Sequence, residues 1–370
     1  MNKQFPFAYT GIPDVGELIR FHVNRSGRWF AVPDPAHVPG LRSHRRLTVL
    51  SLQLKVTHYY HSGFSVEYGD VLLIFDYWRG EHQELQPDRE ITPEMLAGYS
   101  KVFVMISHEH VDHFDPVVYD WRDITDVTYI VSYDMPVGTR GKRMSPGEKY
   151  VMTPDITLYA YGSTDLGVSY LVDIDGFRIF HAGDLNFWHW RDESTASEIE
   201  EAEEEYIREI EPLKTAGIDV AMFPVDPRQG TMYEAGANYF ILTVKPRLMI
   251  PMHYFHRTDI AQEYSRQNRT RATEILAMPG FGDMICLTLD DEGYTNVRLI
   301  RENGVDLVRE ETAEQQIPDE TDPLDINNPF GDSDLPVSLN EEPEIYVAGA
   351  GEPENGSPEP EGTEAEKDEL

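Results

Sequence analysis

The segment VFVMISHEHVDHFDP, residues 102–116, places three histidines and several acids directly after an apolar run. In an extended chain, side chains two residues apart share a side, so His108, His110 and Asp112 can converge, and His113 joins them where the chain turns. Imidazole nitrogens and carboxylate oxygens are common ligands of divalent metal ions. A chance H-x-H-x-D-H match is expected in about one chain in a thousand of this histidine content. The segment therefore predicts a metal site.

This pattern resembles the signature of the metallo-β-lactamase superfamily, whose members are mostly hydrolases that hold two metal ions in an αββα sandwich. The resemblance implies further motifs in a fixed order. An acid should end an early strand, and LLIFDYW supplies Asp76. A bridging aspartate should follow, and then a last histidine, for which FHAGDLN and MIPMHYF supply Asp184 and His253. The similarity covers about residues 54–256, and the order is correct.

The resemblance implies a role for each of these residues. The expected metal ligands are His108, His110, Asp112, His113, Asp184 and His253. Asp76 is expected to hydrogen bond to the ligand loop and brace it. Taken alone, Asp184 would be read as a turn aspartate and His253 as a buried structural histidine, but their place in the order favours metal binding.

One expected ligand is missing. The superfamily's middle histidine would fall near YAYGSTDLG, residues 159–167, which contains no histidine. The first metal site would then have only His108 and His110, whereas the second has Asp112, His113, Asp184 and His253. Three explanations stay open: an oxygen of Ser163 or Asp165 replaces the histidine, His181 or His189 turns in, or the first site is weak and only the second is well filled. We expect two zinc ions by default. An oxygen in place of a nitrogen would shift the preference towards harder ions such as manganese.

The expected activity is hydrolysis of a small ester, lactone or phosphoester, with an anionic metabolite as one option. Two bound metal ions would make hydroxide available near neutral pH, and Asp112 would orient it. Asp112 and His61 are the candidate catalytic residues, and Arg228 and His189 are candidate substrate contacts. The alternative is a metal-binding sensor or scaffold of the same fold that has lost turnover because its first site is incomplete.

Three segments narrow the resemblance further. They are YYHSGFSVEYGDVLLIFDYW, HAGDLNFWHW and FPVDPRQG, and they look like a group of mostly uncharacterised bacterial proteins near the L-ascorbate-6-phosphate lactonase branch. Only 68 residues separate Asp184 from His253, too few for the extra domain of the superfamily's RNA-processing nucleases. Lactonase-like hydrolysis therefore fits best.

Many short apolar segments must position these residues. LKVTHYY, FSVEY and VLLIFDY are strand candidates separated by Ser62-Gly63 and Gly69-Asp70, dipeptides typical of turns. The clearest helix spans residues 195–214, with the capping-box spacing of Thr195 and Glu198. Further helices are predicted over residues 94–99, 232–243 and 259–277. Interspersed strands and helices favour an α+β fold, and the resemblance implies a four-layer αββα sandwich with two mixed β-sheets.

The 370 residues divide into three parts by composition. Residues 1–52 show no periodicity and are expected to form a poorly ordered extension, residues 53–309 the hydrolase domain, and residues 310–370 a disordered acidic tail. The tail holds 20 of the 66 acids against the single Lys367. Such a segment buries too little apolar surface to offset its conformational entropy.

Charge and hydropathy exclude several classes of partner. The net charge of −35 disfavours nucleic acid, whose phosphates need clustered Lys and Arg. Cys286 is the only cysteine, so neither disulfides nor a cysteine zinc site is expected. The sequence lacks a membrane-length apolar run and an N-terminal secretion pattern, which favours a cytoplasmic protein without a membrane partner. The expected partner is a small-molecule substrate, and a homo-oligomer stays open.

Overall fold

The computed structural model describes the backbone of most of the middle of the chain. The described residues are 19–23, 29–33, 52–82, 84–190, 193–268, 270, 272–290, 293–300 and 307–310. Most of the predicted extension, 1–52, and all but the first residue of the predicted tail, 310–370, lie outside them. Within the predicted extension, β1 (Ile19–Val23) and β2 (Trp29–Pro33) form an antiparallel pair where no element was predicted.

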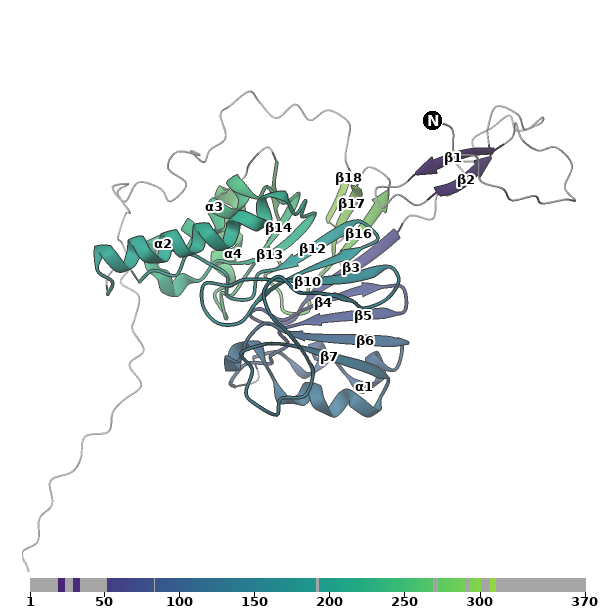
Figure 1. Ribbon diagram of the computed structural model, residues 1–370, viewed down its shortest axis with the longest axis horizontal. Helices are drawn as coiled ribbons and strands as arrows, with labels where there is room; N and C mark the ends of the chain where they lie inside the picture. Colours follow the sequence, from purple (N-terminus) through teal and green to yellow (C-terminus); the bar gives the residue numbers. More distant parts are fainter. Residues whose placement is uncertain are drawn as a thin grey trace, which may run out of the picture. The chain divides into compact units, whose positions relative to one another are not determined.

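The larger sheet has nine strands in the order β18-β17-β16-β3-β4-β5-β6-β7-β8 (Figure 1). Their bounds are β3 (Leu52–His58), β4 (Phe64–Tyr68), β5 (Val71–Phe75), β6 (Lys101–Ile106), β7 (Asp126–Ser132), β8 (Lys142–Met144), β16 (Met284–Asp290), β17 (Gly293–Ile300) and β18 (Leu307–Glu310). Strands β5 to β8 pair in parallel, and the other neighbours are antiparallel. The sheet is therefore mixed, and the predicted turns at Ser62-Gly63 and Gly69-Asp70 join β3, β4 and β5.

The smaller sheet has seven strands in the order β15-β14-β13-β12-β11-β10-β9. Their bounds are β9 (Lys149–Val151), β10 (Ile156–Tyr161), β11 (Ser169–Ile174), β12 (Phe177–His181), β13 (Val220–Pro224), β14 (Leu248–Met252) and β15 (Glu274–Ile275). Strands β9 to β12 are antiparallel neighbours, and β12 to β15 pair in parallel. This sheet is also mixed.

Helices cover the outer faces of the two sheets (Figure 1). Helices α2 (Ala196–Ile210), α3 (Ala235–Thr243) and α4 (Thr258–Gln267) lie on the side of the smaller sheet, and α1 (Pro93–Leu96) lies below β7. Strand β6 is buried on both faces, because Phe103 and Met105 join the core between the sheets while Val102 and Val104 join the core under α1. The predicted α+β sandwich with two mixed sheets is confirmed.

Two helix predictions had different outcomes. The capping box of α2 is confirmed, because Thr195 accepts a hydrogen bond from the Glu198 backbone while the Glu198 carboxylate accepts one from the Thr195 backbone. The helix predicted over residues 259–277 is wrong in its second half, since α4 ends at Gln267. There the Thr270 hydroxyl accepts hydrogen bonds from backbone N–H groups of residues 272 and 273, which competes with helix formation.

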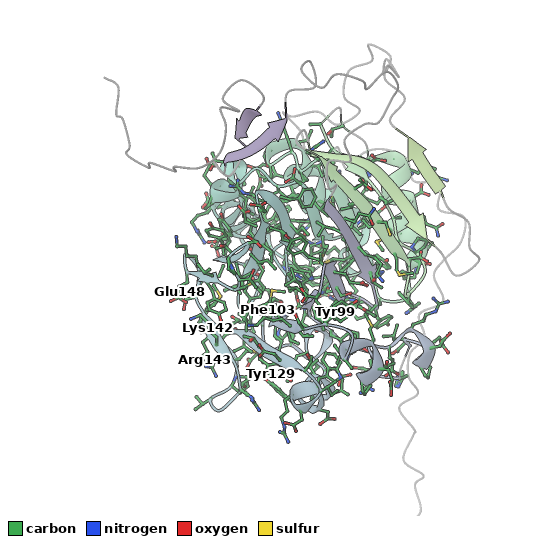
Figure 2. All side chains as sticks on the ribbon, turned by 90° about the vertical axis from the view of Figure 1, so that its right-hand side faces the viewer. Tyr99, Phe103, Tyr129, Lys142, Arg143 and Glu148 are labelled. Atoms are coloured by element: carbon green, nitrogen blue, oxygen red, sulfur yellow. The ribbon has the colours of Figure 1, made fainter. Side chains whose placement is uncertain are left out.

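The basic residues near β8 have a structural role. Arg143 lies at this edge of the larger sheet (Figure 2). Its guanidinium donates to the backbone carbonyls of Tyr133, Met135 and Pro136, over 3.1, 2.7 and 2.6 Å. Arg143 thereby fixes the turn that follows β7.

In the described part of the chain, no helix is long and apolar enough to cross a membrane.

The loop between β10 and β11 presses against the start of the metal-ligand loop. Gly167 has φ +72°, and a Cβ built on it would lie 2.0 Å from the Ser107 carbonyl oxygen and 2.6 Å from the His108 Cβ. The next residue, Val168, donates its backbone N–H to the same carbonyl over 3.0 Å. Only glycine allows this approach, so the two loops are held in a fixed relation.

We predict that Gly167→Ala lowers the free energy of unfolding by about 2 to 4 kcal/mol and weakens metal binding, because the new methyl group pushes on the ligand loop. Gly69→Ala is the matched control, since Gly69 also has positive φ, +59°, but nothing lies within 4 Å of its Cβ position. The control should lose only about 1 kcal/mol. Denaturant unfolding and metal titration measure both variants, and equal losses would contradict the prediction.

Candidate metal centre

The candidate ligands lie where strands of both sheets end. His61 follows β3, Asp76 follows β5 and the His108 loop follows β6 in the larger sheet, while Asp184 follows β12 and His253 follows β14 in the smaller one. These strands run in one direction within each sheet, so their carboxyl ends meet at a common edge. The sheet order thus brings together residues that are far apart in the sequence.

The carboxylate of Asp184 lies at the middle of the site. Its Oδ1 is 3.0 Å from Nε2 of His113 and 3.1 Å from Nε2 of His253, and its Oδ2 is 3.4 Å from Nε2 of His108. All four side chains are buried. One carboxylate therefore faces three imidazoles from two sheets, as a residue shared by two metal ions would.

Several polar atoms of this site are buried without a hydrogen-bond partner. They are Nε2 of His113 and His253 and Oδ1 of Asp184, whose separations of 3.0 and 3.1 Å lack the geometry of a hydrogen bond. Such atoms are rare in folded proteins and indicate a missing ion or ligand. Nitrogen and oxygen atoms of this type fit a divalent metal ion.

Three overlapping groups of side chains could each hold a metal ion among the described residues. They are His61, Asp112, His113 and His253; His108, His113 and Asp184; and His110, Asp165 and Asp184. In each group the candidate ligand atoms lie within 4.8 Å of one another. All six predicted ligands occur in these groups, together with His61 and Asp165.

Two of the imidazoles are braced from behind by carboxylates. Asp76 Oδ2 lies 2.7 Å from Nδ1 of His113, and Asp226 Oδ2 lies 3.0 Å from Nδ1 of His253. Asp76 also accepts the backbone N–H and the hydroxyl of Ser107, over 2.7 and 2.6 Å. Donation from Nδ1 leaves each Nε2 lone pair directed at the centre. Asp76 thus has the geometry of the bracing role that the sequence suggested.

Asp226 was missed by sequence reasoning. It follows β13 in FPVDPRQG and is buried, and it accepts hydrogen bonds from Arg228 as well as from His253. Its signal was an acid at the end of a fully apolar strand, the same signal that identified Asp76.

His61 lies inside the metal centre. Its Nε2 is 3.3 Å from Asp112 Oδ2, and its ring centroid is 3.9 Å from that of His253. Its Nδ1 accepts the backbone N–H of Phe255 over 3.3 Å. Burial, followed by the charge of His253, lowers the pKa of His61 to about 3, so this imidazole is neutral.

Four residues at the site have a strained backbone. The φ angles are +54° for His61, +42° for Asp76, +66° for His253 and +49° for Phe255. Residues with a Cβ rarely adopt this region, and each instance costs about 1 kcal/mol or more. Such strain is concentrated at functional sites, where it aims side chains that a regular strand end would not aim.

The ionisable groups compensate one another. Burial alone would raise the pKa of Asp184, but the charges of His113 and His253 hold it well below its usual range. Burial alone would lower the pKa of His253, but Asp184 and then Asp226 raise it to about 9. The buried carboxylates of the centre are therefore balanced by positive charge, which bound cations would also supply.

The candidates for replacing the missing histidine lie in different places relative to the centre. Asp165 Oδ2 lies 3.7 Å from Nδ1 of His110, at the edge of the centre. His181 does not turn in, because its Nε2 donates to the Ser62 carbonyl over 2.8 Å and its Nδ1 accepts the Gly183 N–H over 3.1 Å. The hydroxyl of Ser163 accepts only the Asp165 backbone N–H, over 3.5 Å, among the described contacts.

The two predicted substrate contacts, Arg228 and His189, differ in their position relative to the cavity. Arg228 lines the cavity at the centre, and its Nε donates to Asp226 Oδ2 over 2.8 Å. His189 is buried, with its ring 4.6 Å from that of Phe187, so it packs away from this cavity. The cavity has a volume of about 600 Å³, within the usual range for small-molecule sites. It is lined by Glu109, His110, Val111, Asp112, Thr164, Asp165, Asp184, Trp188, Trp190 and Arg228.

Two mixed sheets lie between helices and carry an H-x-H-x-D-H loop, an aspartate and a histidine at their common edge. This is the architecture and motif order of the metallo-β-lactamase superfamily that the sequence predicted. No family model matches the sequence.

Curated relatives and a solved structure are similar to this chain. The chain is 24% identical over 245 residues to a UPF0173 metal-dependent hydrolase of Thermococcus onnurineus, across 61% of this chain and 97% of the relative. It is 26% identical over 246 residues to one of Thermococcus kodakarensis, with the same two coverages. The solved metallo hydrolase Igni18 of Ignicoccus hospitalis is 18% identical with a TM-score of 0.48, across 64% of this chain and 100% of that one. These relatives are archaeal, and the bacterial lactonase-like branch stays a prediction.

We predict that Asp226→Asn weakens metal binding about 10- to 100-fold, because the amide is a poorer acceptor for Nδ1–H of His253. Asp173→Asn is the matched control, since Asp173 accepts Nε of Arg178 over 3.0 Å on β11 and lies outside the candidate metal groups. Titration against a chelator of known affinity measures both. Unchanged affinity in Asp226→Asn would show that this carboxylate does not support the ligand.

Proposed function

We propose that this chain is a metal-dependent hydrolase of a small ester, lactone or phosphoester. The observation that carries the proposal is the buried Asp184 carboxylate, faced by three imidazole nitrogens and open to a cavity of about 600 Å³. The shared name of the curated relatives supports the same activity. The acidic net charge of −35 supports a small-molecule substrate over nucleic acid.

Divalent ions bound here would lower the pKa of water and polarise a carbonyl or phosphoryl oxygen. The residues that would hold them are His108, His110, Asp112, His113, Asp184 and His253. Zinc is the default for such a ligand set.

Asp112 has the place expected of the residue that orients the attacking water and accepts its proton. Its side chain is 19% exposed and lines the cavity, whereas its neighbour His113 is buried. His61 faces Asp112 from the protein side at 3.3 Å, and its own position is fixed by the Phe255 backbone. We therefore assign Asp112 the proton transfer and His61 the positioning of Asp112.

Asp165 is the replacement that we propose for the missing imidazole. Its carboxylate is grouped with His110 and Asp184, and it is partly exposed, as a side chain at the cavity wall should be. A carboxylate in place of the imidazole makes the first position, with His108, His110 and Asp184, richer in oxygen than a histidine there would. Harder ions such as manganese should therefore compete better with zinc at this position than they would beside a third imidazole.

We expect Asp165→Ala to reduce the metal content from two ions per chain to one, and Asp165→His to retain two while favouring zinc over manganese. Glu109→Gln is the matched control, because Glu109 lines the same cavity but is absent from the candidate metal groups. Elemental analysis after dialysis against each metal gives the counts. Two ions in Asp165→Ala would remove Asp165 from the ligand set.

The activity itself is tested with purified protein and a panel of esters, lactones and phosphodiesters. We expect turnover that depends on added metal, and a loss of at least about a thousandfold in Asp184→Asn, since metal assistance contributes several kcal/mol to the barrier. Circular dichroism checks that the variant is folded. One tightly bound ion with no turnover on any of the substrates would instead support the sensor alternative.

A further inference from the structure

A second cavity adjoins the first. Its volume is about 620 Å³, and it shares Val111, Asp112 and Arg228 with the cavity at the metal centre. The opening above the metal centre therefore has two lobes. We call the first the metal lobe, bounded by Asp165, Asp184, Trp188 and Trp190, and the second the aromatic lobe, bounded by Tyr60, Trp78, Pro227 and Phe255.

The walls of the aromatic lobe are rigid aromatic rings. Tyr60 and Trp78 are only 2% and 9% exposed, and their ring centroids lie 5.4 Å apart. Phe281 packs edge-on against Tyr60 at 4.8 Å from the other side. These rings are held by the core and present a preformed apolar surface, which is the usual construction of a small-molecule site.

The aromatic lobe directly adjoins the metal centre. The ring of His61 lies 4.0 Å from the ring of Phe255 and 5.8 Å from that of Trp78. Asp112, whose carboxylate faces His61, lines both lobes. A group bound between Trp78 and Phe255 would therefore lie beside His61, whose Nε2 is 3.3 Å from the proton-transferring carboxylate of Asp112.

An apolar side chain and a guanidinium form the boundary between the lobes. Val111, in the middle of the ligand loop, is 70% exposed, an unusual place for an aliphatic side chain beside charged ligands. The Arg228 guanidinium lies 4.9 Å from the centroid of Phe255 and 6.0 Å from that of Trp190. This boundary offers an apolar surface and a donor to a molecule that spans both lobes.

The rim of the aromatic lobe is polar. It carries Glu81, Glu84, His256 and Arg257, and the Arg257 guanidinium is paired with Asp259 at 2.9 Å. The charge of Arg257 is thus already compensated. The specific chemistry of the lobe lies in its aromatic walls, because those are the surfaces that water wets least favourably.

We propose that the aromatic lobe binds a bulky apolar group, the size of an aromatic ring, that the substrate carries on one side of the bond to be hydrolysed. The proposal rests on the hydrolase function above. The reacting carbonyl or phosphoryl lies in the metal lobe. For an ester, the water oxygen forms a bond to the acyl carbon, the bond from that carbon to the alcohol oxygen breaks, and the departing alcohol takes up a proton.

The test compares matched esters on the metal-loaded, full-length protein. Ethyl phenylacetate and benzyl acetate place a ring on the acyl or the alcohol side, and ethyl acetate lacks the ring. We expect kcat/KM for one of the two ring-bearing esters to exceed that for ethyl acetate by roughly ten- to a hundredfold, the range that burial of one aromatic ring gives.

Substitutions locate the preference. Phe255→Ala and Trp78→Ala should reduce this ratio to within about threefold of unity, because they remove the walls of the aromatic lobe. Trp190→Ala is the matched control, since Trp190 is a large ring that lines only the metal lobe and should leave the ratio unchanged. Metal content and thermal midpoint confirm that each variant is folded and loaded.

Direct measurement of ligand binding tests the aromatic lobe independently of the hydrolase activity on which the proposal rests. Calorimetry of the metal-loaded protein with phenylacetate and with acetate needs no turnover, and we expect phenylacetate to bind at least about tenfold more tightly in the wild type but not in Phe255→Ala. Turnover without a ring preference overturns the aromatic lobe and leaves the hydrolase. Tighter phenylacetate binding without turnover on any ester, lactone or phosphodiester overturns the hydrolase and leaves the lobe. Equal binding of the two acids overturns the inference.

Discussion

The structure of the site depends on one buried carboxylate, that of Asp184. Placing a charge in the protein interior is unfavourable unless opposite charge and hydrogen bonds surround it. Here His113, His253 and His108 provide that surrounding, and the carboxylates of Asp76 and Asp226 in turn orient the first two of these imidazoles. Alternating layers of acid and imidazole thus extend from the cavity into the core. Every residue in these layers lies in a segment that directly follows a strand.

Much of the candidate site could be predicted because one loop carries four of its candidate ligands. His108 to His113 stand together in the sequence, so a local pattern was enough to find them, and the order of later motifs led to Asp184 and His253. The cap of α2 was equally local, and it was confirmed. Local patterns succeed where a single segment makes both sides of an interaction.

Residues whose partners come from other segments were harder to predict. Asp226 lies 27 positions before His253, and only the parallel pairing of β13 with β14 brings the two together. His181 had the right chemistry for a ligand, but its ring stacks on Phe75 at 5.2 Å and both of its nitrogens form hydrogen bonds with the backbone. Residue type and order therefore suggested which side chains to consider, while sheet pairing decided which of them meet.

The candidate ligands come from both layers of the sandwich, so a bound ion would connect the two sheets. His61 and the His108 loop belong to the nine-stranded sheet, while Asp184 and His253 belong to the seven-stranded sheet. An ion held by both groups would be a cross-link between the sheets, closing the loop of about 70 residues from His113 to Asp184 without a covalent bond. In a chain whose only cysteine is Cys286, such a cross-link would take the place that a disulfide has in other proteins. Occupancy of the centre would then be coupled to docking of the two sheets, so that a change weakening one would weaken the other.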